Sequence, residues 1–185
     1  MEAACYRPPE QLDAGPVLLR RCRTADSAAI ATAVKESLEH LQPWMPWAVP
    51  QAAEPETQRA RLADAAALWE AGTDFLYSVF LRGSPAVAGG FGLHRQCGPD
   101  CIEMGYWMHA AHCGRGYATA AAGALTGAAL ALPDVRRVEI HCDEANAASA
   151  AVPRKLGYRL DRVDRRQPEA PGESGRLMFW VRERQ

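Results

Sequence analysis

The sequence has no apolar run long enough to cross a membrane, no large net charge and no secretory leader. Its most apolar stretch, residues 118–132, is shorter than the roughly 18 residues of a membrane span and is interrupted by glycine and threonine. The formal net charge of −1 argues against a general nucleic-acid binder. Residues 1–15 lack the apolar core of a signal peptide. These absences predict a cytoplasmic protein that binds neither membranes nor nucleic acids.

Several motifs of metal and nucleotide sites are also missing. None of the six cysteines has C-x-x-C spacing, so no metal site is expected and the thiols are expected to be free. The glycine-rich turn near residue 115 has neither the lysine and serine or threonine of a P-loop nor G-x-G-x-x-G spacing. No Ser-His-Asp order typical of hydrolases can be read from the chain.

With these classes excluded, the composition of the sequence is that of an ordinary globular protein. The chain has 185 residues, of which 48% are apolar, and this is enough for one domain with a sizeable core. We expect residues 1–15 to form a flexible tail and residues 16–185 to form a single domain. Alternation and turn residues predict strands at residues 17–22, 75–82, 87–94, 101–109, 135–143, 158–164 and 176–182. Helices are expected at about residues 26–41, 55–71, 118–132 and 146–156.

Residues 102–131 are the most informative stretch, because they predict a strand, a glycine turn and a helix in succession. Gly114 and Gly116 lie in the turn, and no capping side chain stands just before the helix. A helix N-terminus with free N–H groups behind a glycine turn is a good anion site, although a plain tight turn has the same pattern. We therefore expect a phosphate-bearing cofactor here.

A second unusual stretch is the loop PWMPWAVP at residues 43–50, in which proline prevents regular helix. Trp44, Met45 and Trp47 are either plugs at the edge of the core or one wall of a substrate groove. Aromatic side chains on a rigid loop suit the second role, so these three residues are the candidate substrate-binding residues.

Five segments together resemble the GCN5-related N-acetyltransferase (GNAT) family, in its branch that acetylates ribosomal-protein N-termini (RimJ/RimL-like). They are LQPWMPWA at 41–48, IEMGYWM at 102–108, GRGYAT at 114–119, NAAS at 146–149 and KLGY at 155–158. The resemblance covers about residues 16–184. It implies an α/β (α+β) fold with a mixed, mostly antiparallel twisted sheet of six to seven strands. It also implies a V-shaped splay between the fourth and fifth strands and about four flanking helices.

The resemblance further implies acetyl-CoA as co-substrate, bound in the splay between residues 101–109 and 135–143. Backbone N–H groups of residues 114–119 would hold the pyrophosphate, and the pantetheine arm would pair with the strand edge at 107–109. Cys113 departs from the family motif, which has Gln or Arg there. The residues implied to bind the cofactor are Trp107, Met108, His109, Cys113, Gly114, Arg115, Gly116, Tyr117, Ala118, Thr119 and Asn146.

Amide formation requires loss of an amine proton, a donor to the thioester oxygen and a proton for the leaving thiolate. Glu103 is the candidate base, acting through water or by attracting the cation, unless it is merely a solvated or paired carboxylate. Ser149 is the implied donor to the thiolate, and its alternative is a bond to its own helix backbone. A backbone N–H near Met108 would polarise the carbonyl. His94, His109 and His141 are alternative bases.

The leading interpretation is an N-acetyltransferase that transfers acetyl by direct amine attack to the N-terminal α-amine of a peptide or protein. One alternative acceptor is a small amine such as an aminoglycoside or polyamine, which an acidic cleft built from Glu36, Glu39 and Asp74 would favour. The other alternative is a non-catalytic CoA-binding sensor of the same fold. The branch also makes a homodimer a reasonable expectation.

Overall fold

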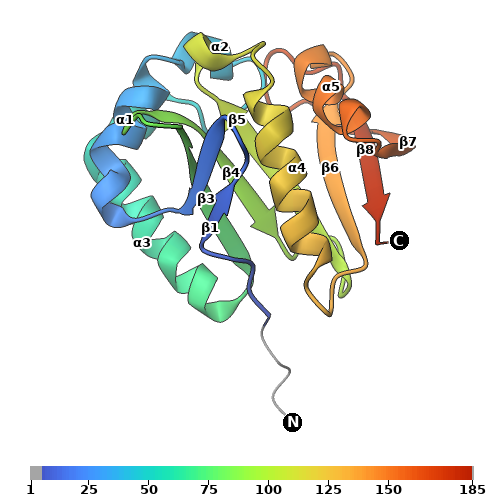
Figure 1. Cartoon of the computed structure of the whole chain (residues 1–185). Coiled ribbons are helices and arrows are strands. Elements are labelled where there is room, and N and C mark those ends of the chain that lie inside the picture. The colour runs from blue at the N-terminus through green and yellow to red at the C-terminus, as the bar shows by residue number, and fades with distance from the viewer. Residues whose placement is uncertain (1–5, 185) are drawn as a thin grey trace.

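A twisted sheet of eight strands lies between two groups of helices in the computed structural model, which describes residues 6–184 (Figure 1). The strands are β1 (Gln11–Asp13), β2 (Val17–Arg21), β3 (Asp74–Leu81), β4 (Val87–His94), β5 (Cys101–Met108), β6 (Arg137–Asp143), β7 (Arg159–Arg165) and β8 (Arg176–Glu183). The helices are α1 (Ser27–Lys35), α2 (Leu38–Leu41), α3 (Pro55–Ala71), α4 (Tyr117–Leu130) and α5 (Ala147–Lys155).

The strand order β1-β2-β3-β4-β5-β6-β8-β7 is antiparallel throughout except between β5 and β6. These two strands are parallel and pair only from Cys101–Glu103 to Arg137–Glu139. Beyond Glu103 they diverge, because no further register pair joins them. The predicted splay is therefore confirmed, and the gap opens at the carboxyl end of β5.

Two differences from the expected fold arise in the first part of the chain. The sheet has eight strands because Gln11–Asp13 pairs with β2, so a strand lies inside the segment expected to be a tail. Residues 1–5 of that expected tail lie outside the described residues. The single helix expected up to residue 41 is divided into α1 and α2, because Ser37 leaves the helical conformation between them.

Two apolar clusters fill the two sides of the sheet. The larger lies under α4 and α5 and includes Ala121, Leu125 and Met104. The smaller lies under α1 and α3 and includes Val34, Leu62 and Trp107. Alternation along β5 therefore sends Met104 and Trp107 to opposite faces. This division matters for the site, because neighbouring residues of β5 face different cavities.

The expectation that all cysteines are free is wrong for one pair. Cys97 and Cys101 form a disulfide across the turn before β5, where their Cα atoms lie 5.4 Å apart. The turn at Gly98 brings the two side chains together, which the four-residue separation alone did not reveal. Across residues 6–184, no helix combines the length and apolar character that a membrane crossing requires.

Candidate active site

The gap between β5 and β6 exposes backbone groups of β5. The His109 N–H donates to the Ala88 carbonyl at 2.9 Å, which fixes the phase of the β4–β5 ladder. Since bonded pairs alternate in an antiparallel ladder, Trp107 bonds to β4, whereas Tyr106 and Met108 turn their N–H and C=O groups toward β6. The β5–β6 ladder has already ended there. An extended ligand in the gap can therefore pair with β5 as an added strand.

The N-terminus of α4 lies beside the same gap and presents free backbone donors. Gly114 and Gly116 adopt positive φ angles of 73° and 80°, a conformation that favours glycine. Gly116 is the N-cap residue, and no side chain caps the helix. The first intrahelical bond is donated by the Ala120 N–H, so the N–H groups of residues 117–119 are left for a ligand. This arrangement confirms the expected uncapped helix and suits an anion.

Two cavities meet at the splay. One, of about 310 Å³, extends from the N-terminus of α4 along α5, and we call it the cofactor cavity. The other, of about 470 Å³, lies over β3, β4 and β5 and is called the acceptor groove. Six residues line both and form the junction, which is where two substrates could react: Trp44, Met45, Tyr106, Trp107, Asn146 and Ser149.

Most residues expected to bind the cofactor line the cofactor cavity. They are Trp107, Met108, Cys113, Gly114, Gly116, Tyr117, Ala118, Thr119 and Asn146. Arg115 is exposed and is not part of the wall. His109 is also outside it, because its Nε2 is 2.9 Å from Glu36 Oε2 and its Nδ1 accepts the Ala111 N–H. The structure thus brings nine of the eleven expected residues together and gives His109 structural partners instead.

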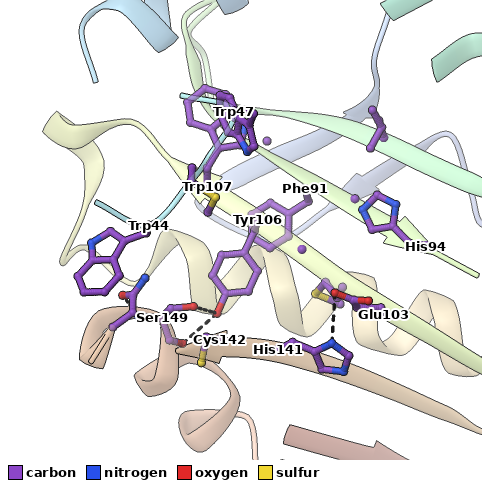
Figure 2. A pocket seen from close by; sticks show the side chains of 18 of the residues that line it. Trp44, Trp47, Phe91, His94, Glu103, Tyr106, Trp107, His141, Cys142 and Ser149 are labelled. Atoms are coloured by element: carbon purple, nitrogen blue, oxygen red, sulfur yellow. Dashed lines mark hydrogen bonds and ion pairs between the residues drawn. The ribbon is translucent and has the colours of Figure 1, made fainter. Parts of the chain in front are cut away.

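Ser149 lies at the junction with its hydroxyl directed at Tyr106 (Figure 2). Ser149 Oγ donates to Tyr106 Oη at 3.2 Å, and Tyr106 Oη donates to the Ser149 carbonyl at 2.9 Å. That carbonyl is available because the residue four positions later is Pro153, which has no N–H to complete the helical bond. Burial raises the pKa of Tyr106, so its hydroxyl stays protonated.

Asn146 and Cys142 complete the β6 side of the junction. The Asn146 side-chain oxygen accepts the Ser149 N–H at 3.1 Å and caps α5, so its NH₂ group is left for the cavities that it lines. Burial raises the pKa of Cys142 to about 11, so this thiol is neutral and a poor nucleophile. The arrangement favours direct attack by an amine over an acyl-cysteine step.

Glu103 lies where β5 and β6 separate, beside His141 (Figure 2), and belongs to a chain of charged side chains. His141 Nδ1 is 3.3 Å from Glu103 Oε1, and His141 Nε2 is 2.7 Å from Glu139 Oε2. The hydrogen bond from His141 lowers the pKa of Glu103. Burial alone would lower the pKa of His141, but the two carboxylates outweigh it and raise that pKa. Glu103 is therefore a stable carboxylate, which attracts cations well and accepts a proton poorly.

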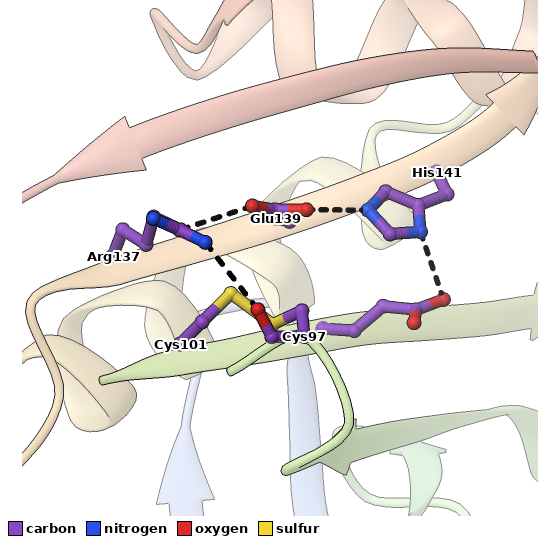
Figure 3. The surroundings of a disulfide bond; sticks show 6 residues. Cys97, Cys101, Arg137, Glu139 and His141 are labelled. Carbon is purple, nitrogen blue, oxygen red and sulfur yellow. Dashed lines mark hydrogen bonds and ion pairs between the residues drawn. A yellow bond between two sulfur atoms is a disulfide. The ribbon is translucent and has the colours of Figure 1, made fainter. Parts of the chain in front are cut away.

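The disulfide adjoins the far end of this chain. Glu139 also accepts from Arg137 Nε at 3.0 Å, and Arg137 donates to the Cys97 carbonyl at 3.3 Å (Figure 3). Within residues 6–184, Cys97, Cys101 and Glu139 are the one group close enough to share a cation. Their sulfur atoms are already joined to each other. This group offers no pair of thiolates to a metal.

The proline-tryptophan loop forms a wall of the acceptor groove. Trp44 and Met45 lie at the junction, whereas Trp47 lines only the groove and contacts Trp107 edge-on, with ring centroids 6.1 Å apart. The opposite rim is the β7–β8 loop, whose Gly172 N–H donates to the Pro43 carbonyl at 2.8 Å. A Cβ at Gly172 would lie 2.6 Å from that oxygen, so glycine permits the two rims to meet.

Sequence reasoning left two features of the site unassigned. Tyr106 was visible in the motif IEMGYWM, but nothing in the sequence predicted its bond to the α5 backbone. Asp74 and His94 face each other at the ends of β3 and β4, with Asp74 Oδ1 2.5 Å from His94 Nδ1. A count of the hairpin register outward from Phe80 and Val87 would have paired Asp74 with Leu93, because it misses the register shift between Val79 and Phe80. Two of the three carboxylates of the expected acidic cleft already have hydrogen-bond partners, because Asp74 contacts His94 and Glu36 contacts His109.

Comparison with known proteins defines the class. The family model described as "Acetyltransferase (GNAT) domain" matches residues 17–159, more than half of the chain. The chain therefore belongs to the GNAT family and is an N-acetyltransferase. No curated protein sequence matches the chain.

Solved structures share the fold over nearly the whole chain. The structure of Mycobacterium smegmatis RimJ in complex with CoA-disulfide has 22% identity and a TM-score of 0.86, covering 96% of this chain and 90% of that one. A ribosomal L7/L12 α-N-protein acetyltransferase, RimL, with coenzyme A has 22% identity and a TM-score of 0.84, covering 94% and 98%. The microcin C7 self-immunity acetyltransferase MccE with acetyl-CoA and AMP has 15% identity and a TM-score of 0.85, covering 95% and 97%. All three structures share the fold of this chain, and each of those proteins is described with coenzyme A, a CoA disulfide or acetyl-CoA bound.

Proposed function

We propose that this protein transfers the acetyl group of acetyl-CoA to the α-amine at the N-terminus of a peptide or protein. The observation that carries this proposal is the acceptor groove, which joins the cofactor cavity at Ser149 and Tyr106. Its floor includes Gly90, Gly92 and Gly105, which add no side chain, so the groove has room for a polypeptide end. The ribosomal-protein acetyltransferases among the structural relatives support the same acceptor class.

In the proposed reaction, the N–H groups of residues 117–119 hold the diphosphate of acetyl-CoA, and the pantetheine arm pairs with β5. A β5 backbone N–H near Met108 polarises the thioester carbonyl. The amine enters from the acceptor groove, where the Glu103 carboxylate attracts its positive charge. After attack and collapse of the tetrahedral intermediate, the leaving thiolate receives a proton through the Ser149 hydroxyl, which Tyr106 positions. The Asn146 NH₂ group contacts the arm.

A peptide panel tests the acceptor. Purified protein is incubated with acetyl-CoA and pairs of peptides that differ only in a free or a formylated N-terminus, each with an internal lysine. Mass spectrometry locates the acetyl group, and a thiol reagent measures released CoA. We expect acetylation of the free α-amine and none of the blocked peptide. Acetylation of lysine in both peptides, or of no peptide at all, would contradict the proposal.

A small cationic amine is the second candidate, because the carboxylates Glu103, Asp143 and Glu173 line the groove. Two of these are committed elsewhere: Asp143 accepts from the backbone at Gly175 and Arg176, and Glu173 pairs with Arg166 at 2.5 Å. Polyamines and aminoglycosides in the same assay distinguish this candidate, since turnover of these alone would favour it. A homodimer and a cytoplasmic location stay predictions.

A further inference from the structure

We propose that His94, oriented by Asp74, is the base that takes the proton from the acceptor amine, while Glu103 serves to attract that amine. The inference concerns the acetyl transfer itself and holds for any primary amine acceptor. The residues responsible lie in one row across the sheet, on the face that forms the floor of the acceptor groove. From β3 to β5 the register pairs Asp74 with His94, and His94 with Glu103.

Hydrogen bonding separates His94 from His141 and His109, and position separates it from His40 and His112, which line the cofactor cavity and not the acceptor groove. His141 has both ring nitrogens within reach of carboxylates, at Glu103 and Glu139. His109 bonds Glu36 with one nitrogen and accepts the Ala111 N–H with the other, and it lies outside the groove. His94 bonds Asp74 through Nδ1, and its Nε2 has no hydrogen-bond partner among residues 6–184. A carboxylate on Nδ1 fixes the tautomer in which Nε2 can accept a proton.

The position of the ring agrees with this role. The ring leans along β4 toward Gly92, where an added Cβ would lie 2.4 Å from His94 Nε2. A Cβ at Gly105, on the neighbouring strand, would lie 3.8 Å from the same nitrogen. Position 92 is nearer than position 94 to the junction at Trp107, because Gly90 is the register partner of that residue. Two glycines therefore give the imidazole space, and Nε2 lies on the side of His94 that faces Gly92. Figure 2 shows His94 on the same side of the site as Glu103.

Glu103 is the weaker base of the two. His141 already supplies a hydrogen bond to its carboxylate, which stabilises the charged form. The charged groups around His94 are Asp74 on β3 and Glu103 on β5, with His141 on β6 and Arg166 after β7 acting on Glu103. Asp74 therefore orients the imidazole through Nδ1, and Glu103 faces it across the β4–β5 register.

The proton balance of the step is simple. An ammonium acceptor gives one proton to His94 Nε2, directly or through one water, and the free amine then forms the new C–N bond. Collapse of the tetrahedral intermediate breaks the C–S bond and sends the electron pair to sulfur. The second amine proton passes to the thiolate through Ser149. The His94 imidazolium then releases its proton to solvent, so one amide, one CoA thiol and one proton result.

The first test uses no acceptor. A negative result would therefore count against His94 as the base and not against the proposed acceptor class. Nitrogen-15 NMR of the histidine rings is recorded in the intact protein at mildly alkaline pH, with and without CoA, and His94→Gln assigns the signal. We expect His94 to carry its proton on Nδ1, beside Asp74, and to leave Nε2 unprotonated. A His94 ring protonated on Nε2 at mildly alkaline pH would overturn the proposal.

The second test measures kinetics of His94→Gln, Asp74→Asn and Glu103→Gln. General base catalysis is worth about 10²- to 10⁴-fold, so His94→Gln should lose at least about 100-fold in kcat with unchanged CoA affinity. It should also lose the rise of kcat/KM with pH. Free imidazole should restore part of the rate of His94→Ala. Glu103→Gln should mainly raise the acceptor KM. Asp134→Asn, which breaks the nearby 2.9 Å pair with Arg95, controls for loss of a carboxylate partner.

Two kinetic outcomes decide against the base. If His94→Gln keeps kcat within about threefold of the parent, far below the effect of a general base, the proposal is wrong. If Glu103→Gln removes the rise of kcat/KM with pH and His94→Gln does not, Glu103 is the base. CoA binding by each variant shows that it is folded, and the NMR test on the parent protein stands if a variant fails to fold.

Discussion

The cofactor cavity and the acceptor groove differ in the groups that line them, which are main-chain groups at the phosphate end of the first and mostly side chains in the second. The phosphate end of the cofactor cavity uses main-chain groups from one short segment, residues 114–119, together with the free edge of β5. The acceptor groove is lined by residues from five strands, three helices and several loops, which lie between Cys22 and Leu177 in the chain. Main-chain recognition tolerates the replacement at Cys113, because the donors are N–H groups that every non-proline residue carries.

The comparison explains what a sequence motif can and cannot reveal. A binding site made of consecutive backbone groups leaves a contiguous signature, since glycines must occupy the positive-φ positions. A site made of side chains from distant strands leaves no such signature, and its members become neighbours only through register. The binding of the acetyl donor can therefore be predicted from the sequence, whereas the choice of the amine acceptor depends on the folded groove.

A carboxylate at the N-terminus of α4 should damage cofactor binding most. Thr119 lies on the first turn of α4 and lines the cofactor cavity. In Thr119→Glu the new charge faces the diphosphate, and repulsion should weaken acetyl-CoA binding by about 100-fold, or about 2.7 kcal/mol. Isothermal titration calorimetry measures the change. Thr57→Glu is the matched control, because Thr57 has the same position in α3 and is exposed.

The control decides how the first result is interpreted. Both variants add a carboxylate to the first turn of a helix, where the helix dipole stabilises it. Thr57→Glu should leave acetyl-CoA affinity within about twofold, since a single surface charge far from the site is screened. Equal losses in the two variants would show that net charge, and not the diphosphate position, is responsible.

Removal of the proton donor at the junction should slow the reaction without weakening cofactor binding. Ser149→Ala should lower kcat by about 30-fold, somewhat less than the 10²- to 10⁴-fold typical of proton transfer by a side chain, with acetyl-CoA affinity unchanged. Tyr106→Phe should cost less, because it removes only the group that positions Ser149. Stopped-flow measurement of CoA release gives both rates. A Tyr106→Phe variant slower than Ser149→Ala would make Tyr106 the donor.

Truncation of the two tryptophans should separate the cavities. Trp47 lines only the acceptor groove, so Trp47→Ala should raise the acceptor KM by about tenfold and leave the acetyl-CoA KM within about twofold. Trp44 lines both cavities, so Trp44→Ala should raise both constants. Leu68→Ala removes another exposed apolar side chain, on α3, and should change neither. A Trp47→Ala variant that raised the acetyl-CoA KM more than the acceptor KM would contradict the assignment of Trp47 to the acceptor groove alone.

The smallest effect concerns stability and the pair formed by Glu103 and His141. The lowered pKa of Glu103 adds stability that is lost as pH falls through that pKa, and the raised pKa of His141 adds stability that is lost as pH rises through it. The pair therefore stabilises most in mildly acidic solution. His141→Gln should lower the free energy of unfolding there by about 1 kcal/mol.

Urea unfolding over a pH series checks this expectation. The difference between the parent and His141→Gln should shrink as the pH rises through the His141 pKa, because the parent then loses its imidazolium. A difference that stays constant across the series would show that His141 stabilises by packing, for example against the Phe179 ring at 4.3 Å, and not by charge.

Much of the fold was predictable, because its strands alternate and its helices have clear ends. Gly72, for example, ends α3 in the left-handed conformation expected of a glycine after a helix. The strand Gln11–Asp13 was missed because three residues carry too little periodicity. The Cys97–Cys101 disulfide was missed because a spacing does not show how a turn orients two side chains.

The site was only partly predictable for the same physical reason. The glycine turn and the wall at Trp44 and Trp47 could be predicted, because each is a local pattern in the sequence. Pro153 leaves the Ser149 carbonyl free for Tyr106, and this contact joins α5 to β5. Such contacts join residues more than forty positions apart, so no local pattern contains them.

The most direct test of the account is a crystal structure of this protein with coenzyme A. We expect the diphosphate within hydrogen-bond distance of the N–H groups of Tyr117, Ala118 and Thr119, the pantetheine arm along β5, and the thiol beside Ser149 and Tyr106. Coenzyme A bound elsewhere, or a gap between β5 and β6 that stays closed to it, would contradict the account.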